Sequence, residues 1–479
     1  YAHINAGKNR LTTVTRTMNI QTLLLGVQET EISINISGLA LNTGSLKEGD
    51  AFIALQGENS HGSDYVEQAI EQGCVVILTE GRDLECAVPC IRIDNLRSHL
   101  ATLAQRFYRQ AHSIKLIGVT GTNGKTSVSL FIARLLEGLK VKTGVIGTLG
   151  ISGSDEKTAN TTPDILALYR ALDRYHQEGV EVAVIEVSSH ALMQNRVDGL
   201  TFDQAIFTNL TQDHLDYHKT MKDYRQAKGR LFSDDKSRHV IVNQDDENHA
   251  YFLDLAADKK QSTFSVDDLS YCHINNQGFL CRLDQFVFEI PLLGRFNLSN
   301  TLAALASLRA LGYSDDDVIP QLSRITSPPG RMQKIANHNI WIDYAHTPDA
   351  LENAMKTLRE HYPESKLRVL FGCGGNRDVG KRAKMGGIAS ELANSVILTN
   401  DNPRNEDAQS IIDDIQIGMK EGFEAEVILD RELAIQTAIT TLTEDECLLI
   451  AGKGHETTQT TGAQILPFSD IKVAQNALL

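Results

Sequence analysis

The sequence lacks several features that would define an environment at once. Its seven cysteines are scattered, and no two of them form a CxxC pair. An odd number of widely spaced cysteines argues against a disulfide framework and predicts reduced thiols in a reducing compartment. No apolar run approaches the roughly 20 residues that a membrane-spanning helix needs, and the N-terminal segment lacks the apolar core of a signal peptide. The sequence therefore predicts a cytoplasmic protein without a membrane span.

An excess of positive charge is also missing. The chain has 46 Lys and Arg residues against 61 Asp and Glu residues, and its net charge is −15 at pH 7. Proteins that bind nucleic acids usually present a basic surface to the phosphate backbone. We therefore expect no nucleic-acid partner, although this balance is compatible with a local basic pocket for a small anionic substrate.

No internal repeat and no low-complexity segment occurs in the 479 residues, of which 42% are hydrophobic and 22% charged. This is ordinary globular composition, and the length predicts roughly two to four domains. Residues 1–17 are polar and are interpreted as a tag or a disordered arm. The segment 18–109 mixes short apolar runs with turn residues and predicts a small α/β domain. In it we expect strands at 49–57 and 74–80 and an amphipathic helix at 63–73.

Apolar runs alternate with helical patterns in the segment 110–330. Strands are expected at 181–187, 204–210 and 239–243, an order typical of a parallel sheet covered on both faces. The turn-rich stretch 274–294 predicts β hairpins instead. Two consecutive prolines in 328–332 then indicate a linker.

The alternation resumes in the segment 331–479. It predicts strands at 340–343, 368–372, 395–399, 426–430 and 447–452, separated by helices. Such an order is typical of a second, doubly wound sheet. The predicted fold class is thus α/β with three domains.

The strongest local motif is TGTNGKTS, residues 120–127, between a predicted strand and a predicted helix. Backbone N–H groups and the helix dipole in such a turn bind phosphates. Lys125 would reach the β- and γ-phosphates of ATP, and the Thr126 hydroxyl would bind Mg²⁺. The general P-loop pattern has another glycine five residues before Gly124, where this chain has Val119. The alternative interpretation is a strand–turn–helix whose glycines are structural.

Polar residues follow other predicted strands. Glu186 comes after an apolar strand and suits a Mg²⁺ ligand, although alone it could be a solvated loop residue. The segment 207–218 holds His and carboxylate side chains that could bind a metal or orient a nucleotide. It could equally be a helix start capped by Thr211 or Asp213. Two asparagines on one face of the helix at 294–300 could contact a purine or simply begin a polar helix.

Basic residues gather in four loops that follow strands of the third predicted domain. The carboxyl ends of parallel strands are where ligands bind, so an anionic ligand is expected there. Each residue alone could be a solvated loop charge. The residues are Arg377, Lys381, Arg382, Arg404, Lys453 and His455.

Together, the motifs resemble those of the Mur ligase family, in its MurE type, which adds the third residue of the peptidoglycan stem peptide. They run in order from about Leu41 to the C-terminus: GTNGKTS, NTT (160–162), EVSSH, TNLTQDHLDYH, PPGRMQ, DYAHTPDAL, FGCGGNRD, DNPR and AGKGHE. The resemblance implies a UDP-substrate-binding domain at 18–109, a central P-loop ATP-binding domain at 110–330, and a Rossmann-like amino-acid-binding domain at 331–479. It also implies a monomer that takes small-molecule substrates.

The resemblance also implies roles for single residues. The ATP site would comprise Gly121, Thr122, Asn123, Gly124, Lys125, Thr126, Ser127, Asn209, Asn300, Arg331 and Asp343. Lys125, Glu186, His214 and Lys228 would be catalytic, with Lys228 carbamylated. The Mg²⁺ ligands would be Thr126, Glu186, His214 and Lys228. From the residues alone, Lys228 would be a surface lysine on a helix.

Two substrates are implied, and their residues fall in two groups. UDP-MurNAc-L-Ala-D-Glu would meet Leu41, Thr43, Asn160, Thr161, Thr162, Ser188, Gln194 and Arg196. The incoming amino acid would meet Arg377, Asp401, Asn402, Pro403, Arg404, Gly452 and Glu456. One departure concerns the uridine end, where Asn42, Thr43 and Gly44 replace an Asp-Ser-Arg triplet of relatives.

The reaction implied by this resemblance is amide formation through an acyl phosphate. The D-Glu carboxylate would attack the γ-phosphate of ATP, and the amine of meso-diaminopimelate would then displace phosphate. L-Lysine in place of diaminopimelate, or a folylpolyglutamate synthase-like ligase, are alternatives. A further alternative is a nucleotide-gated binding or kinase-like protein that forms no amide.

Overall fold

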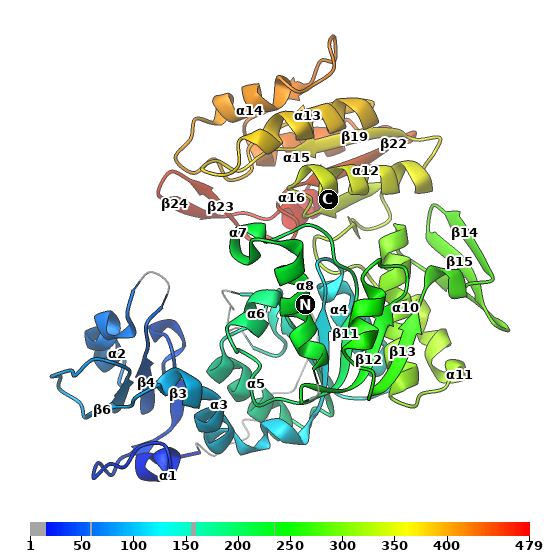
Figure 1. The fold of residues 1–479 in the computed structure, drawn as a ribbon. Helices are drawn as coiled ribbons and strands as arrows, with labels where there is room; N and C mark the ends of the chain where they lie inside the picture. Colours follow the sequence, from blue (N-terminus) through cyan, green and yellow to red (C-terminus); the bar gives the residue numbers. More distant parts are fainter. Residues whose placement is uncertain (1–15, 58–59, 155–159, 234) are drawn as a thin grey trace. The chain divides into compact units, whose positions relative to one another are not determined.

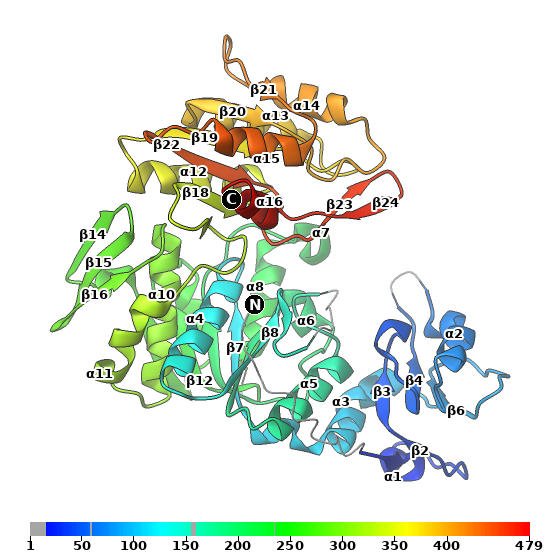
Figure 2. The same ribbon diagram turned by 180° about the vertical axis from the view of Figure 1, so that it is seen from behind.

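The computed structural model describes residues 16–57, 60–154, 160–233 and 235–479 (Figures 1 and 2). The chain forms two compact units, one of residues up to Thr122, Val141–Val240 and Ala250–Gln261, the other of Asn123–Lys140, Ile241–His249 and Ser262–Leu479. The predicted α/β class is confirmed, because helices alternate with parallel strands in both. Residues 1–15 of the expected arm lie outside the described residues. Arg16 is fixed, since its guanidinium pairs with Asp173 at 3.1 Å.

The first unit contains a small parallel sheet in the order β3-β4-β5-β6. Its strands are Gly38–Ala40, Asp50–Ala54, Val76–Thr79 and Cys90–Arg92. Helix α2 (Val66–Glu71) packs on it through Val66 and Ala69, against Phe52 and Ile77. The strands expected at 49–57 and 74–80, and the helix between them, are therefore confirmed. Helix α3 (Leu96–Phe107) follows.

A seven-stranded sheet has the order β13-β12-β11-β7-β10-β8-β9. Its central strands β10 (Val182–Glu186), β7 (Lys115–Thr120) and β11 (Phe202–Phe207) are parallel. In their register Glu186 lies opposite Val119, and Phe207 opposite Thr120, so the carboxyl ends of three strands share one edge. The outer strands are β8 (Thr143–Gly147), β9 (Gly150–Ile151), β12 (Ser237–Asn243) and β13 (Lys260–Phe264). Strand β8 was not expected from the sequence.

Helices follow these strands. They are α4 (Lys125–Gly138), α5 (Ile165–Gln177), α6 (Ser189–Met193), α7 (Leu215–His218), α8 (Met221–Gly229) and α9 (His249–Asp254). Neither Thr211 nor Asp213 caps α7, whose N-cap position is His214, so that part of the sequence prediction is wrong. Among the residues described, no helix is both long and apolar enough to cross a bilayer.

The predicted hairpins are confirmed as an antiparallel sheet of β14 (Tyr271–Asn275), β15 (Gly278–Leu283) and β16 (Phe286–Ile290). Helices α10 (Arg295–Ala310) and α12 (Pro348–His361) belong to the same unit. His361 of α12 contacts the hairpin: its Nδ1 lies 2.7 Å from the Asn275 carbonyl oxygen, and its Nε2 accepts the Gly294 N–H at 3.0 Å. This imidazole is therefore neutral, with its proton on Nδ1.

A six-stranded sheet of the second unit has the order β17-β18-β22-β19-β20-β21 and is parallel except for β17. The strands are Gln333–Lys334, Ile340–Asp343, Glu446–Ala451, Lys366–Phe371, Ser395–Leu398 and Glu426–Val427. Five strands were expected; β21 is shorter than predicted because only 426–427 pair. The β23–β24 hairpin (Thr458–Thr461, Gln464–Pro467) was not anticipated.

Helices cover both faces of this sheet. Alternate residues of one strand serve opposite layers: Val369 packs with α12, α13 (Gly380–Leu392) and α14 (Ala408–Gln416), whereas Leu370 packs with α15 (Arg431–Thr440) and α16 (Asp470–Asn476). The doubly wound arrangement predicted for this part of the chain is confirmed. It leaves the loops after β18, β19, β20 and β22 at one edge of the sheet.

Candidate active site

The phosphate turn between β7 and α4 requires its two glycines. At Gly121, with φ +150°, a Cβ atom would lie 1.9 Å from the Thr208 hydroxyl, and at Gly124, with φ +85°, one would lie 2.4 Å from the Asn300 amide oxygen. Any larger residue would therefore displace neighbouring atoms. Helix α4 begins at Lys125 and is 14 residues long, so its N–H groups and dipole favour an anion at this turn.

Two asparagines of α10 are buried, and their side chains have different neighbours. Asn297 donates its amide N–H to the Leu293 carbonyl at 2.9 Å and so holds the start of its own helix. The Asn300 side chain lies beside Gly124. Of the two, Asn300 is the one that the structure brings to the phosphate turn.

A lysine is buried against the other end of the same turn. Lys228 on α8 has 1% of its surface exposed, and its Nζ donates to the Gly121 carbonyl at 2.7 Å. The amine also lies 4.4 Å from the ring centre of Tyr224. The Tyr224 hydroxyl lies 3.2 Å from that of Thr122, and burial raises its pKa to about 12. The interpretation of Lys228 as a surface lysine is therefore wrong.

Glu186 is the last residue of β10 and is almost fully buried, not a solvated loop residue. Its carboxylate accepts the Thr148 N–H and the Thr148 hydroxyl, each at 3.0 Å. A Cβ at Gly147 would lie 2.0 Å from this carboxylate, so the glycine makes room for it. The carboxylate is thus fixed at the strand edge that β10 shares with β7.

The NTT segment (160–162) is hydrogen-bonded to the loop that follows β10. Thr162 is fully buried; its hydroxyl donates to the Glu186 carbonyl at 2.6 Å and accepts the Ser188 N–H at 3.0 Å. The Thr161 hydroxyl lies 3.2 Å from that of Thr148. Ser188 caps α6 by accepting the Ala191 N–H. Thr162 and Ser188 thus hold the loop after β10 in place.

Three histidines and a tyrosine gather beyond this strand edge. The ring of His190 lies 4.9 Å from that of His214, 4.3 Å from Tyr217 and 5.5 Å from His218. Burial lowers the pKa of His190, and it lowers the pKa of His218, which also bonds the Ser189 hydroxyl at 2.9 Å. A neutral imidazole, which the lowered pKa values of His190 and His218 favour, can accept a proton or act as a metal ligand.

Of the four residues expected to bind Mg²⁺, Glu186 and Thr126 offer the oxygen atoms that this ion prefers. Among the described residues no three His, Cys, Asp or Glu side chains cluster as a protein-only metal cage. Mg²⁺ usually takes one or two carboxylates and completes its shell with phosphates and water. Glu186 offers one fixed carboxylate and Thr126 a hydroxyl. Lys228 could join the set only as a carbamate, because an ammonium has no lone pair to donate.

A cleft of about 1160 Å³ lies within the first unit. The predicted substrate residues Leu41, Asn160, Gln194 and Arg196 line it. Arg196 donates to the Thr162 carbonyl at 2.7 Å, which joins the cleft to the loop around Glu186. Thr43 is not among the lining residues; its hydroxyl instead donates to the Gln68 amide oxygen at 3.2 Å.

In the second unit, the 328–332 segment packs tightly on the loop after β22. At Gly330, with φ +64°, a Cβ atom would lie 2.2 Å from the backbone of Gly454 and His455. The next residue, Arg331, places its guanidinium 4.7 Å from the ring centre of Tyr344. Asp343 accepts the Met332 N–H at 2.7 Å, and burial raises the pKa of its carboxyl despite Arg331. The predicted nucleotide residues Arg331 and Asp343 are therefore neighbours.

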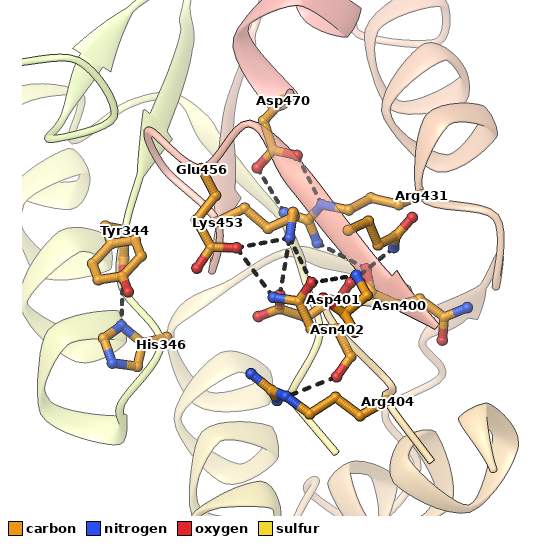
Figure 3. A network of polar contacts seen from close by, with 12 residues as sticks. Tyr344, His346, Asn400, Asp401, Asn402, Arg404, Arg431, Lys453, Glu456 and Asp470 are labelled. Atoms are coloured by element: carbon orange, nitrogen blue, oxygen red, sulfur yellow. Dashed lines mark hydrogen bonds and ion pairs between the residues drawn. The ribbon is translucent and has the colours of Figure 1, made fainter. Parts of the chain in front are cut away.

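The loop after β20 carries the DNPR motif and forms a network with the loop after β22 (Figure 3). Asn402 donates its amide N–H to the Glu456 carboxylate at 3.1 Å. The buried Lys453 amine donates to Glu456 at 2.8 Å and to the Asn402 amide oxygen at 3.1 Å. Burial raises the pKa of the Asp401 carboxyl, although Arg431 and Lys453 oppose that rise. The network fixes Asn402 and Glu456 relative to each other.

Arg404 is held in a left-handed turn with φ +53°. Its N–H donates to the Thr460 carbonyl at 3.1 Å, so the unanticipated β23–β24 hairpin pins this backbone. Its guanidinium donates to the Gly375 carbonyl at 2.8 Å. A Cβ at Gly375 would lie 1.9 Å from the Pro403 carbonyl, so the two loops approach closely. Gly452 lies in the loop after β22. Arg377 lies in the loop after β19, and its side chain is exposed.

The prediction that six basic residues together serve an anionic ligand is wrong for two of them. Arg382 is 2% exposed and pairs with Glu406 and Asp414 at 2.8 and 2.9 Å. Lys453 is fully buried and pairs with Glu456 at 2.8 Å. Their charges are balanced inside the protein.

Arg431 and Asp470 form a fully buried, bidentate ion pair between α15 and α16, with both N–O distances 2.8 Å. The same guanidinium donates to the Asn400 carbonyl at 3.2 Å and to the Ala451 carbonyl at 2.9 Å. Asn400 directly precedes the DNPR motif, and Ala451 is the first residue of AGKGHE. One arginine therefore ties both loops to the C-terminal helix (Figure 3).

Several residues of these networks were not anticipated from the sequence. Thr148, Tyr224 and Thr460 lie outside the recognised motifs, and their partners are distant in the chain. Lys453 lies in AGKGHE, but its burial carries no local signal. A glycine before Thr148, where Glu186 needs space, is the one hint that the sequence offers.

Comparison with known proteins agrees with this geometry. Three family models match: Mur ligase family, catalytic domain, at 35–108; Mur ligase middle domain at 119–308; and Mur ligase, glutamate ligase domain, at 330–454. UDP-N-acetylmuramoyl-L-alanyl-D-glutamate–2,6-diaminopimelate ligase of Coxiella burnetii is 40% identical, over 95% of this chain and 98% of the relative.

Solved structures give the same result. A structure of a UDP-N-acetylmuramoyl-L-alanyl-D-glutamate–2,6-diaminopimelate ligase has a TM-score of 0.68 and 32% identity, and covers 97% of this chain and 99% of that chain. Folylpolyglutamate synthase of Mycobacterium tuberculosis has a TM-score of 0.57 at 19% identity, covers 74% of this chain and 91% of that chain, and shares the fold alone. The phosphate turn, the buried Glu186 and Lys228, and the three matched segments agree: this chain belongs to the Mur ligase family.

Proposed function

We propose that this chain is an ATP-dependent ligase that joins meso-diaminopimelate to the D-glutamate carboxyl of UDP-N-acetylmuramoyl-L-alanyl-D-glutamate. The reaction would supply peptidoglycan precursors in the cytoplasm. The similarity to ligases named for this reaction, over nearly the whole chain, supports the reaction class. The observation that carries the amino-acid assignment is Arg404, which is fixed by Gly375 and the β23–β24 hairpin beside Asn402 and Glu456.

In the first step, the substrate carboxylate would attack the γ-phosphate of ATP and give an acyl phosphate and ADP. This needs positioned phosphates and neutralised charge more than covalent help from the protein. The N–H groups of the phosphate turn and the amine of Lys125 would supply both. Thr126, Glu186, His214 and a carbamylated Lys228 would hold Mg²⁺, which contributes further charge neutralisation at the phosphates.

In the second step, the amine of the incoming amino acid would attack the acyl phosphate, and phosphate would leave. Arg377 would bind the carboxylate nearest the reacting amine. The distal end would meet Arg404 through its carboxylate and Asn402 and Glu456 through its ammonium group. A planar guanidinium can bind a carboxylate through two parallel hydrogen bonds. Lysine has no carboxylate at its distal carbon and so cannot form them.

The discriminating measurement is kcat/KM for meso-diaminopimelate against L-lysine. Sites built around a polar partner can reject an analogue that lacks it by about 10⁴–10⁵, so we expect a strong preference for diaminopimelate. Arg404→Ala should remove most of this preference and leave KM for ATP unchanged, while Arg324→Ala, at an exposed position of the same unit, should change neither. Equal values for the two amino acids would contradict the assignment, and turnover of a folate would favour the folylpolyglutamate synthase alternative.

A further inference from the structure

Among the described residues that line the cleft of the first unit, three are arginines, although the chain carries a net charge of −15. The charged lining residues are the arginines at 97, 170 and 196 and the aspartates at 164 and 198. Asp164 accepts two N–H groups at the start of α5, and Asp198 pairs with Lys236 at 3.0 Å. Both acidic groups are therefore engaged by structural partners. The buried Asp50 also interacts electrostatically with Arg170, and this interaction opposes the rise in the Asp50 pKa that burial causes.

The three arginines occupy different places. Arg196 is tied to the Thr162 carbonyl, next to the loop of Glu186. Arg97 is exposed and donates to the Gln56 carbonyl. Arg170 is half-buried on α5, and its Nη1 donates to the Ser45 carbonyl at 3.1 Å. This contact places the Arg170 guanidinium beside the segment 41–45, where Leu41, Asn42 and Gly44 also line the cleft.

We infer that Arg170 binds the diphosphate group of the nucleotide-linked substrate in this cleft. The inference rests on the proposed function, which supplies a substrate with a diphosphate. Arg170 lies outside every motif by which the chain was recognised. Thr43, one of the residues expected to contact this substrate, donates its hydroxyl to the Gln68 amide oxygen instead. A guanidinium presents several N–H donors in one plane and matches phosphate oxygens better than an ammonium does.

The first test measures the binding of UDP and of uridine to the full chain by calorimetry or ligand-observed NMR. Arg170→Gln should raise the Kd for UDP about 10–100-fold and leave that for uridine nearly unchanged, because uridine has no phosphate. A purely structural role, in which Arg170 only holds the 41–45 segment, would weaken both ligands alike and would overturn the inference. Arg174→Gln is the matched control: it lies one turn along α5, bonds the Ser152 carbonyl at 2.8 Å, and does not line the cleft.

A second test moves the positive charge to another element. Gly44 lies in the same cleft, has an ordinary backbone conformation, and a Cβ there would meet only the Asn42 amide oxygen, at 3.4 Å. Gly44→Arg in the Arg170→Gln background should recover much of the UDP affinity. The UDP affinity of the wild type and of this double variant should fall with added salt. If Arg170→Gln does not fold, Arg170→Lys replaces it, with a smaller rise of Kd expected for UDP alone.

The outcomes separate this inference from the proposed function. If the wild type is active and the Arg170 variant has the same KM for UDP-N-acetylmuramoyl-L-alanyl-D-glutamate, the inference is refuted and the proposed function stands. A wild-type chain that neither binds UDP nor turns over this substrate would refute the proposed function itself. The inference is supported when UDP affinity and this KM change together while KM for ATP stays constant.

Discussion

At the scale of single residues, the proposed role of Lys125 at the phosphates of ATP can be tested, because this residue begins α4 directly after Gly124. Lys125→Ala should lower the rate of phosphate release by about 10²–10³-fold, the cost of removing one preorganised charge partner. The melting temperature should not change. Arg134→Ala, at an exposed position of α4, is the control and should keep full activity. Near-normal activity of the Lys125 variant would rule out the phosphate-binding assignment.

Lys228 is a second residue whose chemistry can be tested. Its amine is buried against Gly121, a position where a carbamate would present oxygen atoms to the phosphate turn. We expect Lys228→Ala to be nearly inactive and a short carboxylic acid in solution to restore part of the activity. Lys222→Ala, exposed on the same helix, should behave as wild type. Full activity without Lys228, or no rescue by any short acid, would contradict carbamylation.

The sequence singled out candidate site residues but gave little information about the surroundings of each side chain. The phosphate turn could be found because its glycines, lysine and threonine are contiguous. The burial of Glu186 and Lys228 could not, since it depends on Thr148 and Gly121, far away in the chain. The internal pairing of Arg382 and Lys453 was missed for the same reason: charge partners come from loops whose approach is decided by tertiary packing.

At the scale of elements, the close approach of the 328–332 segment to the loop after β22 can be measured. Alanine at Gly330 would suffer both the positive φ and a backbone overlap at 2.2 Å, whereas alanine at Gly422, with φ +78°, meets no atom within 4 Å. Both variants should lose about 1–2 kcal/mol of unfolding free energy from the left-handed backbone. Gly330→Ala should lose about 1–3 kcal/mol more through overpacking. Equal losses in chemical denaturation would show that the two segments do not touch.

Strand and helix positions were predictable where apolar runs alternate with helical patterns, as at β4, β10 and β22. Strand β8, TGVIG, was missed because two glycines interrupt its apolar character. The β23–β24 hairpin was missed since it is polar and mostly exposed, and its place is set by backbone bonds to Arg404. Strands that are held by contacts with a distant segment, rather than by apolar residues of their own, are hard to predict from the sequence.

At the scale of the whole molecule, buried imidazoles should set the acid limit of stability. Burial lowers the pKa of His361, which contacts the hairpin, and its neighbours Glu360 and Arg295 act in opposite directions. A histidine with a lowered folded pKa binds its proton more readily when unfolded. Its stabilising contribution is therefore complete above the ordinary pKa of about 6.5 and is lost as the pH falls below it. The free energy of unfolding should decrease in this range.

The contribution of His361 can be isolated by comparing variants across that range. His361→Gln should make the decrease of unfolding free energy less steep between about pH 6.5 and 5. His338→Gln, at an exposed position of the same unit, is the control and should leave the wild-type slope. Burial also lowers the pKa of six other histidines, so part of the slope should persist: His112, His190, His218, His239, His346 and His455. Identical slopes for wild type and His361→Gln would contradict the assignment to this residue.

The ion pair between Arg431 and Asp470 has a consequence for how such chains are judged from genes. Every motif used to recognise this family ends by Glu456, yet the arginine that anchors the DNPR and AGKGHE loops depends on an aspartate beyond them. A gene truncated between the codons of Glu456 and Asp470 would still encode every one of these motifs. Its product would hold an uncompensated guanidinium in the protein interior, which is strongly destabilising. For this architecture, a complete set of signatures is therefore not evidence of a working ligase.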